Sequence, residues 1–266
     1  MTKIVQLLFI VLLAACGSTP APRLPQALEQ AQNADKDARR ALRVGDLVRA
    51  QHDFAKALQL QQSLDDAAGA ATAIINLATV SHQLHDEEGA LNWLDKILLE
   101  KGTIYPVDAS IAAAFRKAVI LTDLARVADA ESTLVVADKL CEKKCTLHSG
   151  IDGLRARLLL LNGDAQGALI LATALGNADE VGKEEQANAL RISAAAEEKL
   201  ARYTDALLHF QRALELDKAL GLGERIGEDL NGMARVTKVL GREQEASVYL
   251  RRAELVNQSL HQLLAH

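Results

Sequence analysis

The chain has few of the residues that interrupt a helix. Only four of its 266 residues are proline, and none of the 160 residues after Pro106 is proline, so nothing in that stretch breaks a helix. Aromatic residues are also scarce, at 3%, although hydrophobic residues make up 49% of the chain. This composition predicts an all-α protein. It leaves open whether the helices form a repeat array or an unrelated bundle rich in alanine and leucine.

The motifs of common enzyme classes are absent as well. The sequence contains no Gly-rich phosphate loop, no His-Glu-x-x-His and no Gly-x-Ser-x-Gly. Of the seven histidines, His82 and His85 lie about one helical turn apart and could ligate a metal, although such a pair is also typical of a solvated helix end. We therefore expect a protein that is not an enzyme, with no cofactor and no metal site.

The charge of the chain also excludes a class of partner. The formal net charge is −5, and removal of an N-terminal segment containing Lys3 would make it −6. A mildly acidic protein has no electrostatic footprint for nucleic acid. We therefore predict that the partners are not nucleic acids.

Alanine recurs at a regular spacing along the chain. Successive pairs begin 40, 40, 38, 38 and 40 residues apart, and the two alanines of a pair are separated by twelve residues. Alanine at both positions fits two antiparallel helices that cross closely, because a larger side chain would push their axes apart. The pairs are Ala38 and Ala50, Ala78 and Ala90, Ala118 and Ala130, Ala156 and Ala168, Ala194 and Ala206, and Ala234 and Ala246.

Other positions repeat in the same register. Four residues after the second alanine stand Phe54, Leu94, Leu134, Ala172, Phe210 and Leu250. Three residues further on stand Ala57, Ile97, Ala137, Leu175, Ala213 and Ala253. This spacing predicts the buried face of an amphipathic second helix. Between the alanines of each pair we expect a turn in the left-handed conformation that glycine favours, at Gly45, His85, Ala125, Gly163, Ala201 and Gly241.

The pattern resembles the tetratricopeptide repeat (TPR) family over roughly residues 31–264. Matching segments include Ile75-Asn76-Leu77-Ala78, residues 163–168 and residues 205–214. The resemblance implies a right-handed α-solenoid of about six helical hairpins with a period of 38–40 residues, longer than the family's usual 34. The aromatic residue that the family often carries in the first helix is missing, since Ser81, Leu121, Leu159, Glu197 and Thr237 stand there.

The N-terminus predicts a lipid anchor. Residues 1–15 resemble a lipoprotein signal peptide, with Lys3 before an apolar run that is too short to span a bilayer. Leu13-Ala14-Ala15-Cys16 resembles a bacterial lipobox, in which the cysteine is acylated with chains such as palmitate. The alternative is an ordinary secretory signal with an incidental cysteine. Two or more acyl chains make a durable anchor, whereas one binds only marginally.

The residues after the cysteine suggest a destination. Gly17 and Ser18 follow Cys16 without an aspartate, which resembles outer-membrane sorting in enterobacterial-type lipoproteins, facing the periplasm. We expect Cys16 and the tether to occupy residues 16–25, and the TPR-like solenoid with its C-terminal capping helix to occupy residues 26–266.

Cys141 and Cys145 are the remaining cysteines. Their spacing of four residues places the Cα atoms about 6 Å apart in a helical turn, which is within disulfide range. The alternatives are unpaired thiols or, with His148, an incomplete three-ligand metal site. We predict a disulfide with a small effect on stability, because the loop that it closes is short.

TPR proteins usually bind partners on the concave face formed by the first helix of each hairpin, and the resemblance assigns residues to that face. Arginines recur there, which suits an extended acidic peptide or a chain-end carboxylate. We expect these charges to be exposed and to contribute little to folding; the alternative is that they only solvate the helix surface. The predicted peptide-binding groove comprises Asn76, Arg116, Arg157, Asn188, Arg191, Asn231, Arg235 and Lys238.

The last helix, roughly Glu243 to Leu264, extends beyond the repeat. It is expected to cap the final hairpin, with an exposed stripe for another helix as the alternative. Together these features predict a lipid-anchored adaptor on the periplasmic side of the outer membrane. It would bind periplasmic or outer-membrane proteins in envelope machinery such as secretin, pilus or outer-membrane assembly systems. A regulator of peptidoglycan hydrolases or synthases is the alternative, and a carrier of a metal or small ligand is a third.

Overall fold

A computed structural model describes residues 25–100, 104–142 and 145–264. Cys16, the predicted signal peptide and most of the predicted tether lie outside the described residues. Within these ranges the chain forms twelve α-helices and no strand. The helices are α1 (Gln26–Arg43), α2 (Leu47–Ser63), α3 (Ala67–Gln83), α4 (Glu87–Leu98), α5 (Val107–Asp123), α6 (Val127–Cys141), α7 (His148–Leu161), α8 (Ala165–Gly176), α9 (Lys183–Lys199), α10 (Tyr203–Leu220), α11 (Gly223–Val239) and α12 (Glu243–Leu264).

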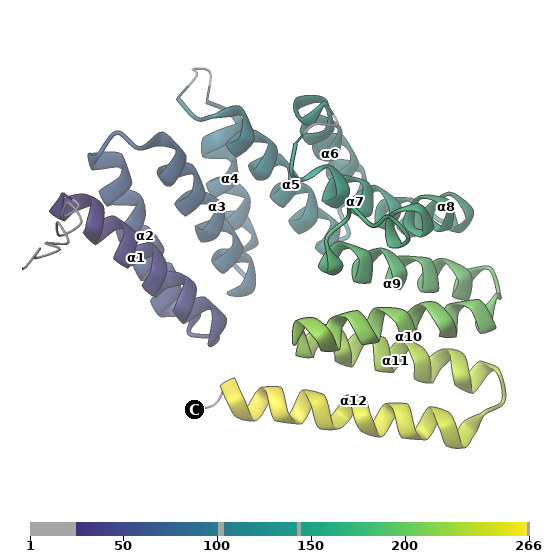
Figure 1. Ribbon diagram of the computed structural model, residues 1–266. Coiled ribbons are helices and arrows are strands. Elements are labelled where there is room, and N and C mark those ends of the chain that lie inside the picture. Colours follow the sequence, from purple (N-terminus) through teal and green to yellow (C-terminus); the bar gives the residue numbers. More distant parts are fainter. Residues whose placement is uncertain (1–24, 101–103, 143–144, 265–266) are drawn as a thin grey trace, which may run out of the picture.

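The helices pair into six antiparallel hairpins that follow one another along a curved path from α1 to α12 (Figure 1). Each helix packs mainly against its neighbours in sequence, so the apolar core runs along the stack and is not gathered at one centre. This is the expected all-α solenoid. None of the described helices is both long and apolar enough to cross a membrane.

The alanine register predicted from the sequence is confirmed. All twelve alanines of the six pairs are buried, ten of them completely. Each pair lies where the two helices of one hairpin cross, and the absence of a longer side chain lets the two backbones approach. The predicted turns are confirmed too. Every turn position has a positive φ, from 55° at Ala125 to 89° at Gly163.

Aspartates begin four of the helices. Asp46, Asp66, Asp86 and Asp164 each accept a hydrogen bond from the main-chain N–H three residues later, at distances of 2.8–3.1 Å. Such a cap satisfies one of the N–H groups that a helix leaves without a partner at its first turn. The caps fix where the second helix of the first, second and fourth hairpins begins, and therefore the register of the alanine crossings.

The core departs from the expected pattern at its C-terminal end. Leu250, predicted to be buried like Phe54 and Phe210, is 52% exposed. The reason is positional, because no described helix covers this face of α12. The neighbouring positions on the same face of α12 are Glu254 and Asn257, both exposed. The exposed surface of α12 thus combines Leu250 and Leu255 with polar side chains, and the capping role of this helix stays a prediction.

The position where the family often carries an aromatic residue is buried in most hairpins. The hydroxyl oxygens of Ser81 and Thr237 are enclosed there without a hydrogen-bond partner. Glu197 occupies the same position in α9, and its carboxylate lies 2.7 Å from His209 Nδ1 on α10. The position thus holds small or polar side chains in the second, fifth and sixth hairpins and leucine in the third and fourth.

The odd-numbered helices form the inner face of the solenoid. From α3 to α11, each odd-numbered helix contacts the next odd-numbered one, while the even-numbered helices pack against odd-numbered helices. Because the odd-numbered helices lie closer together, they follow the shorter, concave side of the curve, and the even-numbered helices form the outer face. The predicted groove residues all belong to odd-numbered helices.

Candidate functional site

The inner face carries the predicted groove residues, but its four arginines have different surroundings. Arg157 on α7 lies 2.9 Å from an oxygen of Asp123 on α5. Arg235 on α11 donates two hydrogen bonds to Glu198 on α9, at 3.1 and 3.3 Å. Both arginines remain substantially exposed, so these ion pairs are available to solvent and can exchange for others.

Arg191 differs from the expectation of an exposed groove side chain, because only 15% of it is exposed. Its Nε donates to Asp229 Oδ1 on α11 at 2.8 Å, its Nη1 donates to Asn188 Oδ1 at 2.8 Å, and its Nη2 donates to Asp217 on α10. Asp217 and Asp229 are both buried. The guanidinium therefore joins three helices and belongs to the folded core, not to an open groove.

Two carboxylates share this one guanidinium, which affects their protonation. The pKa of Asp229 is raised to about 7, because burial and the neighbouring Asp217 raise it more than the hydrogen bond and charge of Arg191 lower it. With both aspartates ionised the cluster carries a surplus negative charge away from water. A proton on Asp229 removes that surplus.

Arg116 on α5 is the groove arginine that has no ion-pair partner among the described residues. Its side chain is half-buried, and burial lowers its pKa while the charge of nearby Asp123 acts in the opposite direction. Asp123 already lies 2.9 Å from Arg157 and 3.5 Å from His82 Nε2. Asp123 thus forms an ion pair with Arg157 and lies near His82, and Arg116 is left without an ion pair on the same face.

The amides of the predicted groove are placed unevenly. Asn76 on α3 occupies the same repeat position as Arg116, two residues before the alanine, and its Nδ2 is buried without a hydrogen-bond partner. Asn188 is engaged by Arg191. Asn231 is half-buried and Lys238 is exposed. Because Asn76 Nδ2 is enclosed, the groove donors that lack a partner and reach the surface lie on α5 and α11.

His82 lies at this inner face without a metal-like arrangement. Its Nδ1 lies 2.6 Å from Glu87 and its Nε2 lies 3.5 Å from Asp123. Among the described residues, no group of three or more histidine, cysteine, aspartate or glutamate side chains could hold a metal ion. His82 thus links the second hairpin to α5 through carboxylates.

Cys141 and Cys145 are joined by a disulfide in the structure. Cys141 ends α6 and its side chain is buried in the core of the third hairpin, while Cys145 lies in the connection to α7. The bond therefore ties the later part of this connection back to the end of α6.

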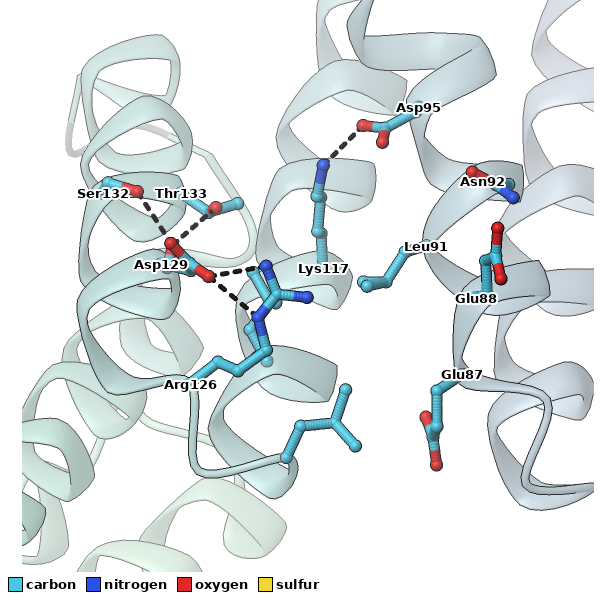
Figure 2. Close-up of a pocket in the computed structure, with 12 residues that line it drawn as sticks. Glu87, Glu88, Leu91, Asn92, Asp95, Lys117, Arg126, Asp129, Ser132 and Thr133 are labelled. Carbon is cyan, nitrogen blue, oxygen red and sulfur yellow. Dashed lines mark hydrogen bonds and ion pairs between the residues drawn. The ribbon is translucent and has the colours of Figure 1, made fainter.

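A cleft of about 500 Å³ opens on the other side of α5, between the outer helices α4 and α6. In Figure 2, Lys117 reaches toward Asp95 and Arg126 reaches toward Asp129, with Glu87 and Glu88 on the α4 wall. The hydroxyl of Thr133 donates to the main-chain carbonyl of Asp129, as does that of Ser132. Both cations and both hydroxyls of the cleft are therefore engaged within the protein.

Sequence reasoning missed the acidic partners of the arginines. One signal was present: five residues before the alanine stand Ala73, Ala113, Ile151 and Ala189 in the second to fifth repeats, but Asp229 in the last. The first repeat has an exposed asparagine there, but an aspartate at a position that is apolar in the four preceding repeats indicates a buried charge that needs a partner. For Asp123 and Glu198 no comparable signal exists, since both stand at exposed or half-buried positions where charged residues are ordinary.

Comparisons with known proteins agree with the fold. No family model matches the sequence, and no curated protein matches it. The solved structures that are similar include the apo form of RapI, with a TM-score of 0.65 and 12% identity over 90% of this chain and 87% of that one. A Rap protein complexed with Competence and Sporulation Factor has a TM-score of 0.63 and 11% identity over 90% and 78% of the two chains.

A third similar structure is a putative kinesin light chain from Podosopora anserina with nearly identical TPR-like repeats. It has a TM-score of 0.55 and 13% identity, covering 75% of this chain and 99% of that one. At these identities the likeness concerns the fold alone. The chain thus has the fold of TPR proteins.

Proposed function

We propose that this protein is a lipid-anchored periplasmic adaptor that binds an extended segment of a partner protein on its inner face. Arg116 carries the proposal. A half-buried guanidinium without an ion pair has lost part of its hydration and gained no partner, so an incoming acceptor would find it already desolvated. The similar Rap structure was solved with Competence and Sporulation Factor bound, which supports the idea that this fold can serve as a receptor.

The anchor part of the proposal rests on Cys16 and the segment around it. A chain tethered by acyl groups would hold the solenoid beside the outer membrane, and the expected partners are periplasmic or outer-membrane proteins of an envelope assembly. Changing Cys16 to serine should leave an unprocessed or mislocalised precursor that no longer incorporates a palmitate analogue. Normal labelling of the Cys16→Ser protein would contradict the anchor.

The binding part is tested by removing one charge. Partner proteins recovered with the wild type from crosslinked envelopes should be lost with Arg116→Gln, because the carboxylate or carbonyl that they offer would lose its donor. Arg49→Gln is the matched control, since Arg49 is an exposed arginine on the outer helix α2. Both variants should melt at the wild-type temperature. Equal recovery with all three proteins would place the partner elsewhere.

A further inference from the structure

Asp123, the last residue of α5, has a carboxylate that is shared between the two neighbouring inner helices. Its Oδ1 lies 2.9 Å from Arg157 Nη2 on α7, and its Oδ2 lies 3.5 Å from His82 Nε2 on α3. The side chains of Asp123 and Arg157 are 35% and 43% exposed. An ion pair that is open to water is weak, so both groups can exchange partners while the helices stay folded.

Arg157 stands between Asp123 and Arg116 in the register of the repeat. Because Ala118 and Ala156 are equivalent positions, Arg157 is equivalent to residue 119 of α5. Arg116 precedes that position by three residues and Asp123 follows it by four, which is about one helical turn in each direction. The ion pair with Asp123 therefore holds the guanidinium of Arg157 on the side away from Arg116.

His82 is placed to compete for Asp123. Helix α3 packs against α2, α4 and α5, and the charged groups of the described residues within ion-pair distance of the His82 ring are Glu87 of α4 and Asp123 of α5. The contact from Nδ1 to Glu87 is the shorter, at 2.6 Å. A neutral imidazole has a single N–H, and the shorter contact favours its donation to Glu87, which leaves Nε2 without a proton for Asp123.

Protonation of His82 changes this balance. An imidazolium donates from both nitrogens, so it can bind Glu87 and Asp123 at the same time. Its added positive charge also attracts the carboxylate of Asp123. Histidine is the side chain whose charge ordinarily changes between pH 5 and pH 8.

We propose that Asp123 is an internal competitor, which holds Arg157 in the free protein and yields it to a carboxylate of the bound segment, and that protonation of His82 favours this exchange. The inference rests on the proposed binding of an extended segment at the inner face. In the exchange, Asp123 turns from Arg157 to the imidazolium of His82, and the guanidinium of Arg157 becomes available on the side of Arg116.

The competitor gives the inner face two properties. A neutral segment offers only carbonyl oxygens, which bind a guanidinium less strongly than the carboxylate of Asp123 does, so only an acidic segment replaces Asp123 at Arg157. Binding of that segment is coupled to proton uptake at His82. Because such coupling is reciprocal, an acidic segment should bind more tightly as the pH falls.

The first test is made on the full chain alone, so its result does not depend on the proposed function. The carbon-detected NMR signal of the Arg157 guanidinium, assigned by its loss from Arg157→Gln, should shift between pH 6 and pH 8 in the wild type and stay in place in His82→Gln. The guanidinium of Arg126, which pairs with Asp129, is the control and should respond equally in both proteins. An equal pH response of Arg157 in the wild type and in His82→Gln would overturn the inference.

The second test uses two short rhodamine-labelled peptides that differ only in aspartate or asparagine at alternate positions. In anisotropy titrations with the full chain, the aspartate peptide should bind at least about fivefold more tightly at pH 6 than at pH 8. His82→Gln should reduce this difference to less than about twofold. Asp229→Asn should keep most of it, although it removes the carboxyl group whose pKa is about 7.

Asp123→Asn should bind the aspartate peptide more tightly than the wild type at pH 8, because the competitor is gone. The asparagine peptide should show no gain from this change. An unchanged affinity in Asp123→Asn, an unchanged pH dependence in His82→Gln, or no binding of the aspartate peptide at either pH would overturn the inference. Loss of envelope partners with Arg116→Gln would still support the proposed function in each of these cases, so the two failures can be told apart.

Discussion

Arg191 Nε on α9 lies 2.8 Å from Asp229 Oδ1 on α11, so the guanidinium of one repeat is bonded to a fully buried carboxylate of the next. The same guanidinium also donates to the buried Asp217 of α10. The cluster crosses the boundary between the last two hairpins. Substitutions in this cluster should therefore change the stability of the last two hairpins and the way in which that stability depends on pH.

The first prediction concerns pH. The folded protein keeps a proton on Asp229 up to about pH 7, whereas the unfolded chain releases it near pH 3.9. Between these values the folded state binds more protons, so this group's contribution to the free energy of unfolding falls as pH rises. The Asp229→Asn protein should lose less stability than the wild type between pH 5 and pH 8, measured by thermal melting. Asp179→Asn, at an exposed position, is the control. Equal pH dependence of stability in all three proteins would contradict the raised pKa of Asp229.

The second prediction separates Arg191 from Arg235. Arg191→Gln leaves two buried aspartates without their cation, which should lower the free energy of unfolding by about 3–5 kcal/mol. Arg235→Gln removes only a solvent-exposed pair with Glu198, and this change should cost less than about 1 kcal/mol. Urea denaturation of both proteins gives the two values. Comparable losses would mean that the buried and exposed pairs are energetically alike.

The third prediction concerns the turn between α9 and α10. Ala201 has a φ of 58°, a conformation that costs a residue with a Cβ about 1–2 kcal/mol. Ala201→Gly should therefore raise the melting temperature. Gly163→Ala is the reverse experiment, because φ is 89° there and an added Cβ would meet no atom within 4 Å. It should lower the melting temperature through backbone strain alone, and opposite signs for the two changes are required.

The fourth prediction concerns the alanine crossings. Ala194 is completely buried where α9 crosses α10 beside Ala206. Leucine there would overpack the crossing and destabilise the protein by about 1–3 kcal/mol. Ala219, at the exposed end of α10, should accept leucine with little change. Calorimetry on both variants tests the register, which similar melting temperatures would contradict.

Sequence periodicity was sufficient for the helices and their crossings because those features depend on local spacing. Each alanine pair and each left-handed turn recurs at fixed intervals, so Ala125 and Ala201 could be assigned to turns even without glycine. Ion pairs between side chains of different repeats could not be assigned in this way. Arg191 and Arg235 look equivalent in the sequence, yet one meets Asp217 and Asp229 in the core and the other meets Glu198 at the surface. Such differences depend on how far successive helices are rotated, which a single sequence does not encode locally.

The end of the array shows the same limit. Leu250 follows the apolar pattern of the earlier hairpins, yet it is exposed because no described helix covers that face of α12. The polar character of Glu254 and Asn257 was visible in the sequence. The sequence was thus sufficient to predict polar side chains on this face of α12, but not to predict that Leu250 is exposed beside them.

The ion pairs of the inner face have a mechanical consequence. Asp123 holds α5 to both α3 and α7 through His82 and Arg157, and Glu198 holds α9 to α11 through Arg235. Across the described residues, no ion pair joins α7 to α9. The helices on each side of this junction are therefore linked to their own neighbours by ion pairs, whereas α7 and α8 are joined to α9 by apolar packing and by the hydrogen bond between the hydroxyls of Thr173 and Ser193. Added salt should weaken the ion pairs on either side and should change the packing at the junction less.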